Sequence, residues 1–460
     1  MADPEGLFEP VLVSDEIARV TSAANWVQKM VEVECSLSQA QARLGLIPAS
    51  AAEAISLLAS SHNLDPTEMG RAARSSATPV IPLVRMLTAK LPKEAMPWIH
   101  YGATSQDILD TATMLVAKES LQVILNKLFE LCSDLAALAE RHRDTIMVGR
   151  TLMQHALPYT FGLKSAVWLS GILDSTLGLE RIYTERLAVQ IGGAGGTLAA
   201  FENAGTDVVM LVADDLGLNP ARIPWHSQRQ RMVELGSALV MVNGTLAKMA
   251  NDIALASQAE IGELAESLGA GGGSSAMPQK VNPVGSIVVN AGFRRAQGLL
   301  VTLYGCLIAE NERGAGEWQA EWQSIQELLQ LCGGAVSRSL TMVDNLFVNE
   351  SKMLDNLELS RGNVMSERVL QAMTRLLGRT EAYDIIREAT IQSALNGTPL
   401  SDELQKVEAF RESFNSDQVQ ELFDPFSYLG SYREFIDRTL DHWQEIQNTW
   451  KVPSGDRNMD

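Results

Sequence analysis

The sequence predicts an all-α protein built around long helices, and three observations lead to this fold class. From Met232 to Ala256 the apolar residues recur at intervals of three and four. No proline interrupts the chain between Pro224 and Pro278, and alternating strand patterns are almost absent. Because apolar residues at this spacing share one face of an α-helix, the segment predicts a single helix of roughly 35 residues, about 50 Å long at 1.5 Å per residue.

Three helical domains are expected along the chain. Its 460 residues are enough for two or three domains. Helix-breaking residues around Pro92, Pro97 and Gly102 predict that an N-terminal domain covers residues 1–110. The long helices place a central domain over residues 111–350, and shorter, more charged segments after Val348 predict a C-terminal domain over residues 351–460.

The central domain should be a bundle of several helices. A second periodic run lies between Leu121 and Leu138, and a third can be followed from Ser286 to about Glu310. In the longest run, four flanking apolar residues widen the apolar stripe: Val233, Val240, Ala247 and Ala254. A stripe of this width needs neighbours on more than one side, so the bundle could be shared between subunits.

Composition limits the possible partners and the compartment. A formal net charge of −19 disfavours a general surface for nucleic acid or anionic membrane, although a small anionic substrate needs only a local basic cluster. The four cysteines have no paired spacing, which fits a reducing cytoplasm and suggests neither disulfides nor a zinc site. An acidic start without a signal peptide, and no apolar stretch of about 18 residues, predict a cytoplasmic protein that does not enter a membrane. Nothing in the sequence calls for a metal or an organic cofactor.

Residues 269–283, GAGGGSSAMPQKVNP, are the most informative stretch. Four glycines allow the backbone to approach a ligand closely, while hydroxyls, Lys280 and Asn282 supply donors and one fixed positive charge. The apolar Met277 and the rigid Pro278 are unusual in a flexible linker. The stretch therefore predicts an anion-binding loop, with a surface linker as the alternative.

A second motif, HYGATSQDILDTA, runs from His100 to Ala112. Its hydroxyls and free backbone N–H groups at a helix start suit a carboxylate, although Thr104, Ser105 and Asp107 could equally form only an N-cap. The glycines of residues 192–197 lack both a P-loop lysine and a preceding strand, so nucleotide binding is not expected there.

Three further motifs are weak when taken alone. GRTLMQHALP, residues 149–158, places four polar side chains within one or two turns: Arg150, Thr151, Gln154 and His155. PWHSQR, residues 224–229, contributes His226 and Arg229, and NERGAGEWQAEW, residues 311–322, contributes Arg313. In an acidic protein these arginines could simply form surface ion pairs.

Together these motifs resemble the fumarase/aspartase superfamily. Residues 273–282 are similar to its signature GSSxMPxKxN, residues 100–107 to HxGxTSxD, and residues 149–154 to GRTHxQ with Leu152 in place of the histidine. The resemblance covers nearly the whole chain. It implies three helical domains with a long central helix bundle, and homotetramers whose active sites take segments from several subunits.

The resemblance also implies roles for individual residues. The implied catalytic residues are Ser274, which exchanges a proton with the substrate, His155, and Lys280, which stabilises the resulting anion. The implied substrate-binding residues are His100, Thr104, Ser105, Arg150, Thr151, Gln154, His226, Arg229, Ser275, Met277, Asn282 and Arg313.

Within the superfamily the chain is most similar to the bacterial 3-carboxy-cis,cis-muconate cycloisomerases. The features that favour this branch are HYGATSQD, Leu152 followed by QHALP, the PWH triplet, EWQAEW, and Ile287 where many lyases keep a glutamate. The implied activity is lactonisation of a small polycarboxylate in aromatic (protocatechuate) degradation. Gln279 and Val281 depart from the cycloisomerase loop, which leaves open a lyase acting on a succinyl-type substrate, or a non-catalytic structural relative.

Overall fold

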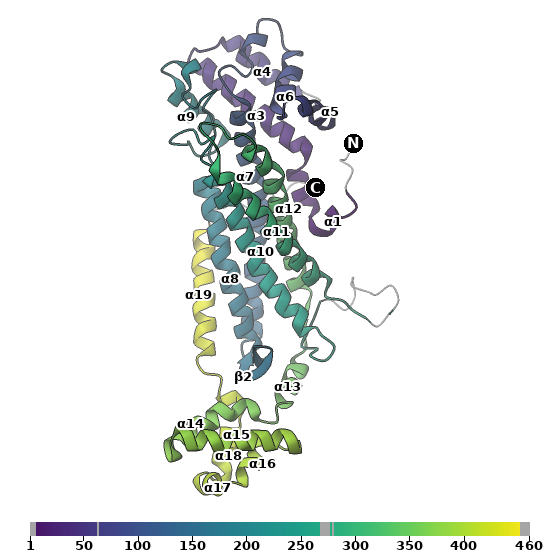
Figure 1. Ribbon diagram of the computed structural model, residues 1–460, viewed down its shortest axis with the longest axis vertical. Coiled ribbons are helices and arrows are strands. Elements are labelled where there is room, and N and C mark those ends of the chain that lie inside the picture. The colour runs from purple at the N-terminus through teal and green to yellow at the C-terminus, as the bar shows by residue number, and fades with distance from the viewer. Residues whose placement is uncertain (1–5, 62–63, 267–276, 278–279, 451–460) are drawn as a thin grey trace.

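The structure, a computed structural model, describes residues 6–61, 64–266, 277 and 280–450. It is an elongated helical molecule with a central bundle and a smaller helical region at each end (Figure 1). The all-α prediction is confirmed. In the described residues the strands form two short two-stranded antiparallel sheets, and no helix is both long and apolar enough to cross a membrane.

Five long helices form the bundle, and all five contribute residues to its main core. They are α7 (Ser105–Arg141), α8 (Phe161–Arg181), α10 (Gln230–Ala256), α11 (Val284–Gly305) and α12 (Glu317–Asp344). Residues of α7 such as Leu121, Ile124, Leu128 and Leu135 are fully buried, as the second periodic run predicts. The third run corresponds to α11.

The longest predicted helix is shorter than expected. The apolar seam from Met232 to Ala256 lies in α10 as predicted, but α10 has 27 residues. The chain turns immediately after Ala256, and Gly262 in this turn has a φ of +59°. The absence of proline permits a longer helix but does not require one, so the length of roughly 35 residues is wrong.

The N-terminal region caps one end of the bundle (Figure 1). The helices of this cap are α3 (Ala23–Arg43), α4 (Ala49–Ser61), α5 (Pro66–Ala72) and α6 (Val80–Thr88), joined later in the chain by α9 (Gly205–Leu216). The first two helices, α1 (Glu9–Leu12) and α2 (Asp15–Val20), pack against the bundle itself. One hydrophobic core runs from these helices into the bundle. The predicted boundary at residue 110 falls inside α7, so the division at this point stays a prediction.

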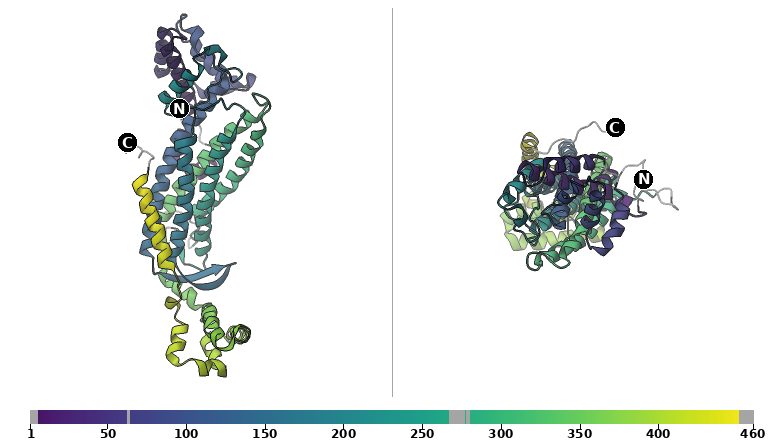
Figure 2. Two further views of the ribbon diagram at one scale, coloured as in Figure 1. Left: turned by 90° about the vertical axis from the view of Figure 1, so that its left-hand side faces the viewer. Right: turned by 90° about the horizontal axis from the view of Figure 1, so that it is seen from above.

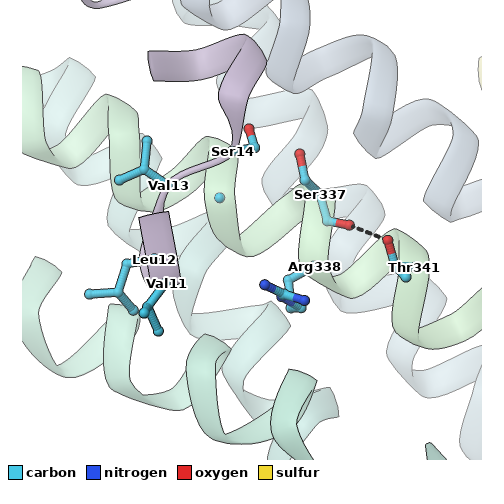
Figure 3. A pocket seen from close by; sticks show the side chains of 8 residues that line it. Val11, Leu12, Val13, Ser14, Ser337, Arg338 and Thr341 are labelled. Carbon is cyan, nitrogen blue, oxygen red and sulfur yellow. Dashed lines mark hydrogen bonds between the residues drawn. The ribbon is translucent and has the colours of Figure 1, made fainter. Parts of the chain in front are cut away.

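The first residues cross the outside of α12. Figure 3 shows Val11 to Ser14 lying over this helix, beside a cavity of about 120 Å³ whose wall includes Arg338. A side chain at Gly334 would collide with the carbonyl of Leu12. The close approach of the two segments therefore requires glycine at this position.

The opposite end of the bundle carries two small sheets and the C-terminal region. The hairpin of β1 (Ile146–Thr151) and β2 (Gln154–Thr160) crosses the end of the bundle (Figure 2), and β3 (Leu264–Glu266) pairs with β4 (Leu346–Val348). Beyond α13 (Glu350–Glu358) lie α14 (Ser366–Leu377), α15 (Arg379–Asn396), α16 (Leu400–Gln405), α17 (Glu408–Ser413) and α18 (Ser416–Leu422), which share a separate hydrophobic core. The last helix, α19 (Tyr432–Thr449), returns along α7 and α8.

Candidate active site

The start of α7 is the centre of the first cluster of candidate residues. Thr104 is the N-cap and Ser105 the first helical residue, as the sequence suggests. The Asp107 carboxylate accepts the N–H of Thr104 at 3.0 Å through Oδ2, which fixes the entry of the chain into the helix. The free N–H groups of this first turn and the positive end of the helix dipole favour an anion in front of Thr104 and Ser105.

Asp107 also joins two distant segments to this helix start. Its Oδ1 accepts the N–H of Gly192 at 2.9 Å and lies 2.7 Å from Nε2 of His226, while Oδ2 accepts the N–H of Gly193 at 2.8 Å. Both Asp107 and His226 are buried. A Cβ at Gly192 would lie 2.7 Å from the His226 ring, which explains the glycine there.

This arrangement corrects the role predicted for His226. A ring buried behind α7, with Nε2 bonded to Asp107, does not present that nitrogen to a ligand. We therefore assign His226 to holding Asp107 and the residue 192–193 turn in place.

Changing Asp107 to asparagine is expected to destabilise the protein by roughly 2–4 kcal/mol, because a buried amide would turn one NH₂ donor toward existing donors. Urea or thermal unfolding measures the loss. Asp207→Asn, the same change at an exposed residue of α9, is the control and should alter stability little. Equal effects of the two variants would contradict the central role of Asp107.

Arg313 approaches the same helix start from the segment before α12. Its Nη1 donates to Oγ1 of Thr104 at 2.7 Å, and its Nη2 donates to the carbonyl of Ala194 at 3.1 Å. These contacts hold a guanidinium beside the N-terminus of α7, 209 residues away in sequence. The structure thus places Arg313 at Thr104, next to Ser105 in the chain.

His100 completes this cluster on the side of α3. Its Nδ1 lies 2.6 Å from Oε1 of the buried Glu34, and its backbone has a φ of +58°. Burial acts to lower the pKa of His100, but the charge and the hydrogen bond of Glu34, together with the charge of Asp107, raise it, so that the pKa lies above its ordinary value. Arg313, bonded to Thr104, and His100, four residues before Thr104 in the chain, therefore supply two basic side chains at this helix start.

Arg229 lies deeper and has a different role from the predicted one. It is 1% exposed, and its Nη1 and Nη2 donate to Asp110 at 2.7 Å and Glu321 at 2.6 Å. Trp318 Nε1 donates to the same Asp110 at 2.9 Å. The prediction that Arg229 binds a substrate carboxylate is therefore wrong: two carboxylates inside the core already occupy this side chain.

The second cluster lies on the β1–β2 hairpin, at the other end of the bundle. The predicted residues Thr151, Gln154 and His155 are exposed here, and Arg150 donates to the buried Glu263 at 2.6 and 2.8 Å. The motif was expected to span one or two turns, but it is a β-hairpin. The pKa of His155 is lowered, first by partial burial of the ring and then by the charge of Arg150.

The turn of this hairpin is apolar and strained. Leu152 and Met153 have φ values of 49° and 66°, and they are 96% and 71% exposed. Positive φ angles are unfavourable for branched or bulky side chains. An apolar tip of this kind is typical of a surface that another molecule covers.

The third cluster belongs to the loop of residues 269–283. Ser274 and Ser275 lie outside the described residues; Met277 and Lys280 are exposed, and Asn282 is half-buried. Where the chain enters α11, Glu266 accepts the N–H groups of Gly285 at 2.7 Å and Ser286 at 2.8 Å. Because Glu266 ends β3, its carboxylate joins the chain before the loop to the chain after it.

Within one chain, the cluster at the start of α7 and the cluster on the β1–β2 hairpin lie far apart. The helix α7 has 37 residues, a length of about 55 Å at 1.5 Å per residue. His100 and Arg313 lie at its start, whereas β1 follows its end. The hairpin lies at the same end of the bundle as the start of β3, because Arg150 is bonded to Glu263 just before this strand.

Several acidic residues of the site were not predicted from the sequence. They are Glu34, Asp110, Glu263, Glu266 and Glu321. In a chain with 56 acidic residues each of them looks like a solvated surface charge. Asp110 and Glu321 lie inside two of the motifs, although no role was assigned to them. Glu34 lies among Met30, Val31 and Leu37 on the apolar face of a helical pattern, which was a further signal.

Comparison with known proteins identifies similar chains over almost the whole length. The family described as "Lyase" matches residues 12–298, and that described as "Adenylosuccinate lyase C-terminus" matches residues 362–439. The nitrosuccinate lyase of Streptomyces davaonensis is 38% identical over 447 residues, covering 95% of this chain and 94% of that protein. The 3-carboxy-cis,cis-muconate cycloisomerase of Acinetobacter baylyi is 36% identical, covering 94% of this chain and 98% of that protein.

The fold agrees with a solved structure as well. The crystal structure of β-carboxy-cis,cis-muconate cycloisomerase from Acinetobacter calcoaceticus has a TM-score of 0.88 and 33% identity, and the match covers 95% of this chain and 100% of that chain. The resemblance inferred from the motifs is therefore confirmed.

Proposed function

Because this chain belongs to the lyase family of the fumarase/aspartase superfamily, we propose that it is a cycloisomerase that lactonises 3-carboxy-cis,cis-muconate to 4-carboxymuconolactone. Membership makes it an enzyme of that superfamily, and relatives at 35–36% identity are named 3-carboxy-cis,cis-muconate cycloisomerase. The names of these relatives support 3-carboxy-cis,cis-muconate as the substrate. The geometry of the site supports a small polycarboxylate as the substrate class.

The observation that carries the proposal is the carboxylate-binding cluster at the start of α7. Arg313 bonded to Thr104, the His100 imidazole with its raised pKa, and the helix N-terminus together favour an anion here in a chain of net charge −19. A substrate with three carboxylates needs several such contacts. Lys280 and Asn282, and His155 on the hairpin, supply the others in the assembled site.

The chemistry follows from where charge develops. When a carboxylate oxygen adds across the conjugated double bond, the neighbouring carbon becomes a carbanion next to another carboxylate. This intermediate is an aci-carboxylate with two negative oxygens, and Lys280 and Asn282 would stabilise it most where its charge is greatest. Ser274 then delivers the proton to carbon, which completes the lactone without a metal or an organic cofactor in the scheme.

The assembled site requires more than one subunit. The first cluster and the hairpin lie at opposite ends of α7, so copies arranged in a homotetramer would bring the start of one α7 to the loop and hairpin of others. Exposed apolar residues on α10 and α11 support association: Met241, Ile287, Val301 and Tyr304 are each more than half exposed in the single chain.

A second candidate is a β-elimination lyase acting on a succinyl-type substrate. The similarity to a nitrosuccinate lyase at 38% identity favours it, as do Gln279 and Val281, which depart from the cycloisomerase loop. Elimination passes through the same aci-carboxylate, with Ser274 removing the proton instead of delivering it.

The deciding experiment follows the ultraviolet absorbance of 3-carboxy-cis,cis-muconate with the purified protein and identifies the product. We expect loss of the diene absorbance and formation of the lactone. Nitrosuccinate, assayed by nitrite release, and succinyl adducts, assayed by fumarate release, are tested in parallel. Turnover of one of these without lactone formation would favour the lyase, and turnover of none would favour a non-catalytic relative.

A further inference from the structure

We propose that Glu34 is the positioning residue that keeps His100 positively charged and directs its Nε2–H toward a substrate carboxylate. The proposal rests on the proposed function, because it takes His100 as a carboxylate-binding group. It adds a residue of α3 to which the sequence assigned no role.

The geometry places Glu34 directly behind the His100 ring. The side chain of Glu34 is 1% exposed, and its Oε1 lies 2.6 Å from Nδ1 of His100, whose own side chain is 20% exposed. The carboxylate is therefore on the protein side of the imidazole. The remaining ring nitrogen, Nε2, is the one left for a ligand.

A second contact from α3 fixes the backbone beside His100. Gln41, buried on the same helix, donates through Nε2 to the carbonyl of Tyr101 at 2.8 Å. The φ of +58° at His100 is a strained backbone angle that needs such support. Thus α3 holds the backbone turn through Gln41 and the imidazole ring through Glu34. The Gln41 contact is structural, and the Glu34 contact is electrostatic, so the two can be tested separately.

The charge state of His100 decides what it can bind. A neutral imidazole that donates Nδ1–H to Glu34 has a lone pair on Nε2 and repels a carboxylate. An imidazolium donates from both nitrogens, so that Nε2–H can bind an anion. Glu34 on α3 and Asp107 on α7 supply the negative charges that raise the pKa of His100 against the opposing effect of burial. Arg313 lies on the other side of the cluster, bonded to Thr104.

The second oxygen of Glu34 suggests that this pair is kept for function. Among the described residues, Oε2 of Glu34 is buried without a hydrogen-bond partner. A buried carboxylate with one unsatisfied oxygen is unfavourable for stability. Such a loss of folding stability is expected where a buried charge prepares a site for its ligand.

The test is Glu34→Gln, which keeps the shape and an oxygen acceptor but removes the charge. We expect KM for 3-carboxy-cis,cis-muconate to rise roughly ten- to hundredfold, the range for losing a hydrogen bond to a charged group, while kcat changes little. Binding by the imidazolium is present below the His100 pKa and lost as pH rises through it. The alkaline fall of kcat/KM should therefore move to lower pH in the variant, since burial, then opposed only by the charge of Asp107, lowers this pKa.

The matched control is Gln41→Met, which removes the other α3 contact without changing charge. It should lower thermal stability and leave the alkaline fall of kcat/KM where it is in the wild type. If the alkaline fall of kcat/KM moves equally in both variants, α3 acts only by holding the turn, and this result would overturn the proposal.

A substrate-independent measurement separates this inference from the proposed function. The protein has six histidines, so histidine-selective NMR labelling can follow their titration, with His100→Asn identifying the resonance of interest. We expect His100 to titrate at lower pH in Glu34→Gln than in the wild type. An unchanged titration refutes the role of Glu34, whereas absent turnover of the muconate by the wild type refutes only the substrate.

Discussion

The Arg229→Met variant is expected to lose most of the stability of the bundle, because removing this guanidinium leaves two carboxylates uncompensated in the core. Asp110 and Glu321 are 2% and 1% exposed, and both are bonded to Arg229. Breaking one buried ion pair by removing a partner costs about 3–5 kcal/mol, and here a single arginine serves two partners. Thermal unfolding at neutral pH should show the loss as a large fall in Tm.

The stability lost in Arg229→Met should be smaller at low pH than at neutral pH. Burial raises the pKa of Glu321, and Arg229 opposes this rise. Without the arginine the pKa of folded Glu321 rises further, so the folded state binds a proton that the unfolded state releases. The variant is then more stable at low pH and loses this stability as the pH rises through the pKa of Glu321. The difference in Tm between the variant and the wild type should therefore become smaller when the pH is lowered from about 8 to 5.

Two controls make the result specific. Arg231→Met removes a half-buried arginine two residues further along the chain, whose Nη1 donates to the carbonyl of Arg186, and it should have a much smaller effect. The double variant Arg229→Met with Glu321→Gln removes one uncompensated charge and should recover part of the stability. If the double variant is less stable than Arg229→Met alone, the uncompensated charge of Glu321 is not the cause of the stability loss.

Mixing two inactive variants should restore activity if the sites are shared. Ser274→Ala removes the proposed proton donor, a change expected to lower kcat about 10²- to 10⁴-fold. Arg313→Ala removes a proposed carboxylate-binding group of the first cluster, near the other end of the bundle. When subunits of the two variants are mixed equally and reassembled at random, roughly a quarter of the sites receive an unmodified copy of each residue.

Activity of the mixture, compared with each variant alone, is the measurement. The matched control mixes Ser274→Ala with Lys280→Ala, two changes in the same loop, which one chain always contributes together; such mixtures should stay inactive. If verified mixed tetramers of Ser274→Ala and Arg313→Ala also stay inactive, the idea that each site takes these two residues from different subunits is wrong.

The long helices could be predicted because their burial repeats along the sequence. The seam from Met232 to Ala256 and the run from Leu121 to Leu138 both lie in the core as expected. Helix ends were less predictable, since the end of α10 depends on a turn rather than on a proline. The cap at Thr104 was readable because a local pattern of hydroxyl and carboxylate specifies it.

The β1–β2 hairpin was missed because short strands leave little periodic signal. Its turn contains Leu152 and Met153, not the glycine or asparagine that usually marks positive φ. The contacts of Arg229 and His226 could not be predicted either, because their partners Asp110, Glu321 and Asp107 are more than 90 residues away. Sequence spacing identified the candidate side chains, and only the fold decided which of them are buried.

The return of α19 changes how the C-terminal region should be regarded. The chain leaves the bundle after α13, forms the separate core of α14–α18, and comes back so that Trp443 packs on Phe129 of α7 with ring centroids 4.9 Å apart. The small domain is therefore an insertion between two bundle helices rather than a tail. Its excision with a short joining peptide would preserve the bundle surface, whereas a stop codon before it would also remove α19 and uncover the apolar flank of α7 and α8.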